Sequence, residues 1–210
     1  MEELQKILAN AFEPYKTFFW LAAETGMRAG ELCGLRVEDV DLGNGIVHVH
    51  QSVWGGKVQT PKTMNAVRSF AISKELQNRL ERLVLQWRPN PFRLLFVSRS
   101  GTPFDANNVV KRRLHPILKE LELPLCGLHA FRHANGSLMD RLNAPIKIRQ
   151  QRLGHSDPRL TLSVYTHTVS EDDRMVAGQI GKLLEMRPQL FPSCSQVAKE
   201  MPPLAAVAFN

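Results

Sequence analysis

The amino-acid sequence predicts one domain that is mainly α-helical and carries a small antiparallel β-sheet, an α+β fold. Over most of the chain apolar residues recur at helical spacing, as Leu76, Leu80 and Leu83 do. Residues 46–50 and 67–72 instead alternate apolar and polar side chains, as half-buried strands do. The 210 residues contain no internal repeat or low-complexity linker and are enough for one sizeable hydrophobic core.

Helices are predicted where this spacing lies between recognisable start and stop residues. Proline in a first turn and glycine after a last turn are typical helix boundaries, and Pro14 and Gly26 enclose one apolar helix in this way. Asp105 is a residue type that caps a helix start. The predicted helices cover residues 2–11, 14–26, 29–35, 74–87, 105–121, 129–142, 145–153, 158–166 and 171–186.

The strands are predicted between residues 46 and 72. Residues 46–50 form the first strand. Gly55 and Gly56 then give a turn signal, after which residues 57–59 can return as the second strand. Residues 67–72 are the third. The pattern therefore predicts an antiparallel sheet of about three strands.

The composition indicates a globular protein with a polyanionic partner. Hydrophobic residues make up 43% of the chain and charged residues 22%, which excludes wholesale disorder. The net charge of +7 favours nucleic acid, because each Lys or Arg that meets a phosphate releases counterions. The cysteines, Cys33, Cys126 and Cys194, have no disulfide or zinc-site spacing. Since we find no signal peptide and no apolar run of membrane length, we expect a cytoplasmic location and no membrane partner.

The densest group of chemically capable side chains lies between His129 and Tyr165. His129 and Arg132 are three residues apart and share one face of a predicted helix. Gly154 ends the next helix just before His155, and the helix after that presents Tyr165. An arginine neutralises phosphate oxygens, a histidine exchanges protons near neutral pH, and a tyrosine forms a covalent ester. This combination suits attack on a phosphodiester.

Two motifs nearer the N-terminus add an arginine and a lysine to the candidate site. Arg28 lies in TGMRAGEL between two glycines, where its guanidinium can reach a ligand. Glu31 can hold Arg28 through a charge-assisted hydrogen bond. Lys62 lies in TPKT, in the turn between two predicted strands, where it can donate a proton to a leaving oxygen. Lys57 is the competing candidate for this role.

These motifs resemble those of the tyrosine recombinases, also called phage integrases. The resemblance covers roughly residues 10–185, and the stretch from GLHAFRH to VYTH is its most specific part. The chain contains 2 tyrosines, Tyr15 and Tyr165, so a tyrosine nucleophile has little competition. In the family's order and at its approximate spacings, the matching residues are Arg28 in TGMRAGEL, Lys62 in TPKT, His129 and Arg132 in HAFRH, His155 in LGH and Tyr165 in SVYTH.

The resemblance implies a reaction and a role for each residue. Tyr165 attacks a DNA phosphodiester and forms a 3′-phosphotyrosine, and a 5′-hydroxyl of a partner strand later rejoins the DNA. No metal and no nucleotide cofactor is implied. The remaining roles are a clamp on the scissile phosphate for Arg28 and Arg132, general acid for Lys62, acid–base support for His129, and a hydrogen bond to the phosphate for His155.

The resemblance also implies a domain plan and partners. Residues 1–186 correspond to the catalytic domain, and residues 187–210 to a C-terminal tail that can dock on a neighbouring subunit. We expect the family's N-terminal DNA-binding domain to be absent from this chain. The expected partner is double-stranded DNA, on which the family forms a homo-tetramer, while a monomer is compatible with the free protein. Further basic side chains expected to bind DNA are Lys111, Arg112, Arg113, Lys147, Arg149, Arg152 and Arg159.

One departure from the family pattern lies in the helix that carries HAFRH. Asn135 and Gly136 follow that motif, where stronger helix formers are expected. A glycine inside a helix costs about 1 kcal/mol relative to alanine. We therefore expect this helix to be loosened.

Other functions stay open from the sequence. His129 and His133 are four residues apart, a spacing that can hold a metal on a helix, so a metal-dependent hydrolase is one alternative. A zinc-protease helix would also need a glutamate, which this one lacks. The further alternatives are a non-catalytic DNA-binding regulator and a type IB-like DNA-relaxing enzyme. Cleavage that persists in a chelator would exclude the hydrolase, and a covalent adduct lost in Tyr165→Phe would exclude the regulator, whereas the relaxing enzyme shares this chemistry and stays open.

Overall fold

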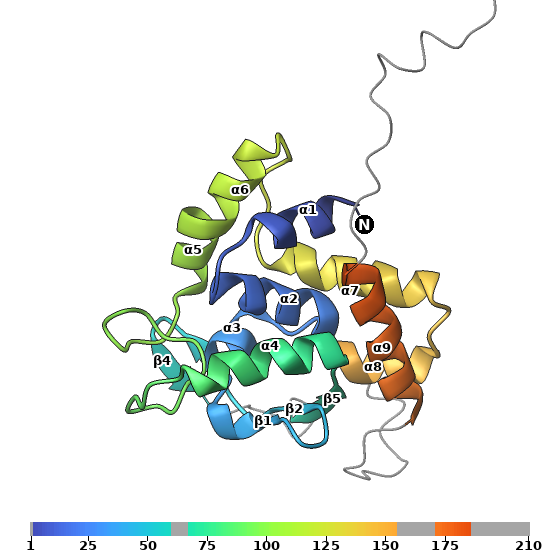
Figure 1. The fold of residues 1–210 in the computed structure, drawn as a ribbon, viewed down its shortest axis with the longest axis horizontal. Coiled ribbons are helices and arrows are strands. Elements are labelled where there is room, and N and C mark those ends of the chain that lie inside the picture. The colour runs from blue at the N-terminus through green and yellow to red at the C-terminus, as the bar shows by residue number, and fades with distance from the viewer. Residues whose placement is uncertain (1, 60–66, 155–170, 186–210) are drawn as a thin grey trace, which may run out of the picture.

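Helices make up most of the structure, a computed structural model that describes residues 2–59, 67–154 and 171–185. A small sheet lies along one side of the helices (Figure 1). Within the described residues, no helix is long and apolar enough to cross a membrane. The mainly α fold with a small antiparallel sheet is confirmed. The helices are α1 (Glu2–Asn10), α2 (Tyr15–Thr25), α3 (Ala29–Gly34), α4 (Lys74–Leu85), α5 (Ala106–Val109), α6 (His115–Glu120), α7 (His129–Arg141), α8 (Ile146–Leu153) and α9 (Glu171–Glu185), with a 3₁₀ turn η1 (Val37–Asp39) and a π-helical turn η3 (Val110–Leu114).

The helix boundaries lie close to the predicted ones. α2 ends at Gly26, whose φ of 66° is left-handed backbone that glycine adopts freely. The Asp105 carboxylate accepts a 2.7 Å hydrogen bond from the Asn108 N–H and caps α5. The predicted helix 105–121 is divided into α5, η3 and α6, which follow one another directly. The predicted helix 158–166 lies outside the described residues.

The main sheet has three strands in the order β1-β2-β5. They are β1 (Val40–Asp41), β2 (Ile46–Val49) and β5 (Arg68–Ala71), and both pairings are antiparallel. The first and third predicted strands are therefore neighbours. The third member of the sheet is β1, which the sequence pattern did not predict.

The predicted second strand belongs to a separate hairpin. β4 (Lys57–Gln59) pairs with β3 (Ser52–Trp54) rather than with β2, which corrects the predicted sheet. Gly55 and Gly56 have φ of 57° and 72°, the left-handed backbone of a tight hairpin turn. A turn of this length brings together the residues that flank it directly, so 57–59 can return only along 52–54.

The helix α2 is the centre of the core. Every residue of it from Thr17 to Thr25 is buried, and α4, α7 and α9 pack against it (Figure 1). Phe19 of α2 stacks on Phe131 of α7 with ring centres 5.4 Å apart. This packing fixes the end of α2, and the turn that follows it, beside α7.

Candidate active site

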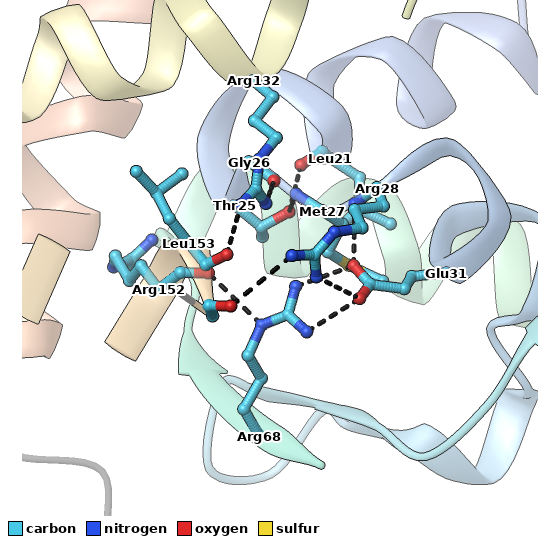
Figure 2. Close-up of polar contacts among 11 residues, drawn as sticks. Leu21, Thr25, Gly26, Met27, Arg28, Glu31, Arg68, Arg132, Arg152 and Leu153 are labelled. Carbon is cyan, nitrogen blue, oxygen red and sulfur yellow. Dashed lines mark hydrogen bonds and ion pairs between the residues drawn. The ribbon is translucent and has the colours of Figure 1, made fainter. Parts of the chain in front are cut away.

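The carboxylate of Glu31 joins Arg28 and Arg68 (Figure 2). Arg28 directly precedes α3, and Glu31 is the third residue of that helix. The carboxylate accepts hydrogen bonds from the Arg28 backbone N–H at 2.7 Å and from Arg28 Nη1 at 3.2 Å. Arg68 of β5 donates to both carboxylate oxygens, from Nη1 at 2.8 Å and from Nη2 at 2.7 Å. One carboxylate therefore orients two guanidinium groups from distant parts of the chain.

The three side chains differ in their exposure to solvent. The side chains of Glu31 and Arg68 are 8% and 5% exposed, whereas that of Arg28 is 49% exposed. Burial alone would raise the pKa of the Glu31 carboxyl, but the hydrogen bonds and charges of Arg68 and Arg28 hold that pKa below its ordinary value. The carboxylate is therefore ionised at neutral pH, and Arg28 can reach a ligand from this support.

Arg132 of α7 brings a third guanidinium to the same place. Its Nη1 donates to the Gly26 carbonyl at 2.7 Å, and its Nη2 donates to the Leu153 carbonyl. Burial, and then the positive charges of Arg28 and Arg68, lower the pKa of Arg132 to about 10. Arg132 is thus still protonated at neutral pH. We call Arg28, Arg68, Arg132 and Glu31 the arginine cluster.

The C-terminal end of α8 borders the arginine cluster. The last backbone carbonyls of this helix have no partner within it and carry partial negative charge, so guanidinium donors stabilise them. Three successive carbonyls each accept a hydrogen bond from one arginine of the cluster (Figure 2): Arg152 from Arg68 Nε at 3.3 Å, Leu153 from Arg132 Nη2, and Gly154 from Arg28 Nη2 at 3.5 Å. The next residue in the chain is His155.

Asn135 fastens the helix that carries Arg132 to the end of α2. Its buried side-chain amide donates to the carbonyls of Ala23 and Glu24 at 2.9 and 2.8 Å. A Cβ on Gly26 would lie 2.8 Å from Asn135 Oδ1, so this turn needs glycine for the close approach as well as for its positive φ. The helix α7 continues through both Asn135 and Gly136.

Of the remaining predicted catalytic residues, the structure describes only His129. His129 is the exposed first residue of α7, one helical turn before Arg132. Its ring packs edge-on against that of His133, with ring centres 4.5 Å apart. Over residues 2–59, 67–154 and 171–185, no group of three or more His, Cys, Asp or Glu side chains could hold a metal ion. The predicted Lys62, His155 and Tyr165 lie outside the described residues.

The second tyrosine of the chain is part of a packed aromatic group. Tyr15 stacks on Phe104 with ring centres 5.2 Å apart. The guanidinium of Arg113 lies 4.7 Å from the centre of the Tyr15 ring. These contacts give Tyr15 a structural role in the packing of α2 against the segment 104–113.

The basic residues predicted to bind DNA differ in exposure. The exposed ones are Lys111, Arg112 and Arg113 on η3 and Lys147 on α8. Arg149 is half-buried, pairs with Asp140 and donates to the Ala144 carbonyl at 2.7 Å. Arg159 lies outside the described residues.

Arg152 corrects the prediction that it contacts DNA, because its side chain is 1% exposed. Its guanidinium pairs with Asp173 and donates to the carbonyls of Glu24 at 3.0 Å and Ala71 at 2.7 Å. The basic residues around Arg152 suggested a DNA contact, whereas the helical spacing of apolar residues indicated that Arg152 is buried. Arg152 is four residues after the buried Ile148 and therefore lies on the inward face of α8.

Arg68 is the member of the arginine cluster that the sequence did not predict. The alternation of apolar and polar residues predicted that Arg68 lies in the strand 67–72, but it assigned no function to this side chain. A signal was present, because side chains two residues apart in a strand face the same side, and Arg68 alternates with the core residue Phe70. An arginine at such an inward position is almost always paired.

The arginine cluster is suited to an anion with several oxygens. Three guanidinium groups against one carboxylate leave an excess of two positive charges around the end of α8. Guanidinium forks match the geometry of phosphate oxygens. Fixed donors of this kind stabilise negative charge that grows on a phosphate in a transition state.

Similar known proteins are integrases and recombinases. The profile described as the Phage integrase family matches residues 1–171. The chain is 31% identical over 178 residues to an integrase of Staphylococcus phage L54a, which covers 77% of this chain and 50% of that protein. It is 29% identical over 185 residues to the ICEBs1 integrase of Bacillus subtilis, which covers 81% of this chain and 49% of that protein.

Solved structures give the same fold. The Tn1549 transposon integrase in complex with circular intermediate DNA superposes with a TM-score of 0.66 at 23% identity, over 87% of this chain and 64% of that chain. XerA recombinase superposes with a TM-score of 0.59 at 26% identity, over 75% of this chain and 54% of that chain.

The fold is thus that of a tyrosine recombinase catalytic domain, and it contains the arginine cluster described above. The chain belongs to the phage integrase family. It spans about half the length of the two integrases described above.

Proposed function

We propose that this chain is the catalytic domain of a site-specific DNA recombinase that cleaves and rejoins DNA through Tyr165. The observation that carries the proposal is the convergence of Arg28 and Arg132 on the end of α8, directly before His155. Arg28 and Arg132 come from motifs 104 residues apart, and both donate to the same helix end. Such a pair of guanidinium groups can hold two oxygens of one phosphate.

The proposed cleavage step is a transesterification that needs no external energy source. The phenol oxygen of Tyr165 attacks the phosphorus of the scissile phosphodiester, and the bond from phosphorus to the 5′-oxygen breaks. His129 supports removal of the phenol proton, and Lys62 donates a proton to the departing 5′-oxygen. The resulting 3′-phosphotyrosine keeps the bond energy of the phosphodiester. A 5′-hydroxyl then attacks the phosphotyrosine, rejoins the strand and frees Tyr165.

The arginine cluster supplies charge stabilisation in this scheme. Negative charge increases on the non-bridging oxygens as the tyrosine attacks, and fixed guanidinium donors stabilise that charge without reorganising. Arg28 contacts the phosphate from its half-exposed position, while Arg132 acts from the buried side of the cluster. His155 adds a hydrogen bond to the phosphate.

The expected partner is double-stranded DNA. The exposed Lys111, Arg112, Arg113 and Lys147 supply backbone contacts. Strand exchange between two duplexes implies four subunits on DNA, with residues 187–210 docking between subunits. A related integrase of the same fold is described in complex with DNA, which supports this partner. The proposed place of action is the cytoplasm.

A nicked suicide substrate tests the proposal. Cleavage next to the nick releases a short 5′-hydroxyl fragment by diffusion, so the covalent intermediate accumulates. We expect a protein–DNA adduct that survives denaturation, forms in the presence of a chelator and is lost in Tyr165→Phe. Tight binding without an adduct would instead support a DNA-binding regulator. Cleavage that stops in the chelator would support a metal-dependent hydrolase.

A further inference from the structure

The proposed reaction gives no role to Arg68, yet this side chain contacts both Glu31 of α3 and the end of α8. We propose that Arg68 is a positioning residue that sets the orientation of Arg28 and the position of Gly154 at the same time. The inference rests on the proposed function, because it names a further residue on which strand cleavage depends. It is carried by three sets of contacts.

The first contact passes from Arg68 through Glu31 to Arg28. Arg68 donates to the two oxygens of the Glu31 carboxylate from Nη1 and Nη2, at 2.8 and 2.7 Å. A planar guanidinium that binds both oxygens fixes the plane of the carboxylate as well as its position. The same two oxygens receive the Arg28 backbone N–H at 2.7 Å and Arg28 Nη1 at 3.2 Å. The direction of the Arg28 guanidinium therefore depends on where Arg68 holds the carboxylate.

The second contact is with the end of α8. Arg68 Nε donates to the Arg152 carbonyl at 3.3 Å. A Cβ on Gly154 would lie 3.2 Å from both Cζ and Nε of Arg68, so the guanidinium packs directly on the backbone there. Gly154 has a φ of 57° and its carbonyl accepts from Arg28 Nη2 at 3.5 Å. Arg68 thus supports Arg28 on one side and the residue before His155 on the other.

The third set of contacts keeps Arg68 itself in place. It lies in β5, where its backbone is opposite Val49 of the neighbouring antiparallel strand β2. Its Cζ lies 5.1 Å from the centre of the Phe70 ring. Since its side chain is 5% exposed, water competes little for its donors. The Arg68 guanidinium is therefore held in one place, and its contacts set the positions of both Arg28 and Gly154.

The test compares adduct formation on two suicide substrates. One carries an ordinary scissile phosphate, and the other carries a methylphosphonate, in which a methyl group replaces one non-bridging oxygen and removes the negative charge. An arginine that acts on that charge matters less for the neutral substrate. We expect Arg68→Met to slow adduct formation on the phosphate about 100-fold, the cost of a small misplacement of catalytic groups. The loss on the methylphosphonate should be much smaller, as for Arg28→Ala.

The ratio of the two rates does not depend on the folded fraction, because both substrates report on the same preparation. It therefore separates positioning from simple destabilisation, which slows both reactions equally. Arg68→Lys should restore part of the phosphate rate, since an ammonium can reach the Glu31 carboxylate but cannot bind both its oxygens and the Arg152 carbonyl. Binding of uncleaved DNA, measured beside the rates, should change little in either variant.

The matched control is Arg79→Met. Arg79 of α4 pairs with Glu75 at 2.8 Å and lies 4.3 Å from the Trp20 ring centre. This variant should lose stability but keep the wild-type ratio of rates. An Arg68→Met protein that cleaves the phosphate at the wild-type rate, or that slows equally on both substrates, would overturn the inference. A wild-type protein that forms no adduct with either substrate would instead overturn the proposed function.

Discussion

Arg152 of α8 and Asp173 of α9 form a buried ion pair that joins the two helices flanking residues 155–170. The side chains are 1% and 5% exposed. The second oxygen of Asp173 accepts the Ala71 N–H at 2.6 Å, which adds β5 to the same junction. Because residues 155–170, which include the proposed nucleophile Tyr165, connect these two helices in the sequence, the pair fixes the two ends of that segment relative to each other.

Asp173→Asn should destabilise the domain strongly. The substitution leaves the Arg152 guanidinium buried beside an uncharged partner, and breaking a buried ion pair in this way costs about 3–5 kcal/mol. The free energy of unfolding from urea denaturation measures the loss. Glu171→Gln is the control on the same helix, since Glu171 is 94% exposed and lies 3.9 Å from Arg174. That change should cost below about 1 kcal/mol. Equal losses of unfolding free energy in the two variants would show that the buried ion pair stabilises the domain no more than the exposed one does.

Arg28→Ala and Arg132→Ala should both suppress adduct formation, by about 100-fold or more, because each removes a donor to the transition-state charge. They should differ in stability. Arg28 is half-exposed, so its loss should leave the melting temperature nearly unchanged. Arg132→Ala leaves the Gly26 and Leu153 carbonyls without their guanidinium donor, so it should also lower the melting temperature. Adduct yield and thermal unfolding measured together check this, and full activity in either variant would refute the phosphate clamp.

Lys62→Ala should slow cleavage of a normal 5′-oxygen leaving group and slow a sulfur-substituted one much less. A thiolate leaves without protonation, so a missing general acid matters little for it. Lys57→Ala is the control, because Lys57 lies exposed in the hairpin strand β4. Single-turnover rates on the two substrates give the comparison. If Lys57→Ala shows the sulfur rescue and Lys62→Ala does not, the general acid is Lys57.

The stability of the domain should fall between pH 4.5 and about 7 because of Glu24. Burial raises the pKa of this carboxyl from 4.5 to about 7, against hydrogen bonds from Ser73 and Trp20 and the charge of Arg152. In that window the unfolded chain has lost the proton that the folded protein still holds. The contribution is therefore fully present below pH 4.5 and is lost as pH rises through about 7, a change of about 3 kcal/mol.

Denaturation of the wild-type protein and of Glu24→Gln across this pH range isolates the effect. Glutamine does not titrate, so the difference in unfolding free energy between the two proteins should change with pH and level off above about 7. A difference that stays constant from pH 4 to 8 would show that Glu24 keeps an ordinary pKa.

Local signals made most of the helices and three of the four residues of the arginine cluster predictable from the sequence. Gly26 and Gly154 end their helices as expected, and the motifs around Arg28 and Arg132 led to residues that converge in space. These predictions depend on neighbours within a few positions along the chain.

The misjudged residues have partners far away in the sequence. Arg152 bonds to Glu24, 128 positions away, and Arg68 bonds to Glu31, 37 positions away. Asn135 was noted only as a weak helix former, yet its amide reaches Ala23, 112 positions away. Such pairings follow from tertiary packing, which a pattern of charges and apolar residues does not encode. The same holds for β1, which is only two residues long and too short to alternate.

The most direct test of the account is to map the residue that becomes joined to DNA. After reaction with the suicide substrate, trypsin digestion should leave the DNA remnant on the peptide of residues 160–174, whose single tyrosine is Tyr165. Mass spectrometry of that peptide is predicted to place a 3′-phosphodeoxynucleotide on the Tyr165 phenol. A remnant found on Tyr15, on a histidine or on no residue at all would contradict the central claim.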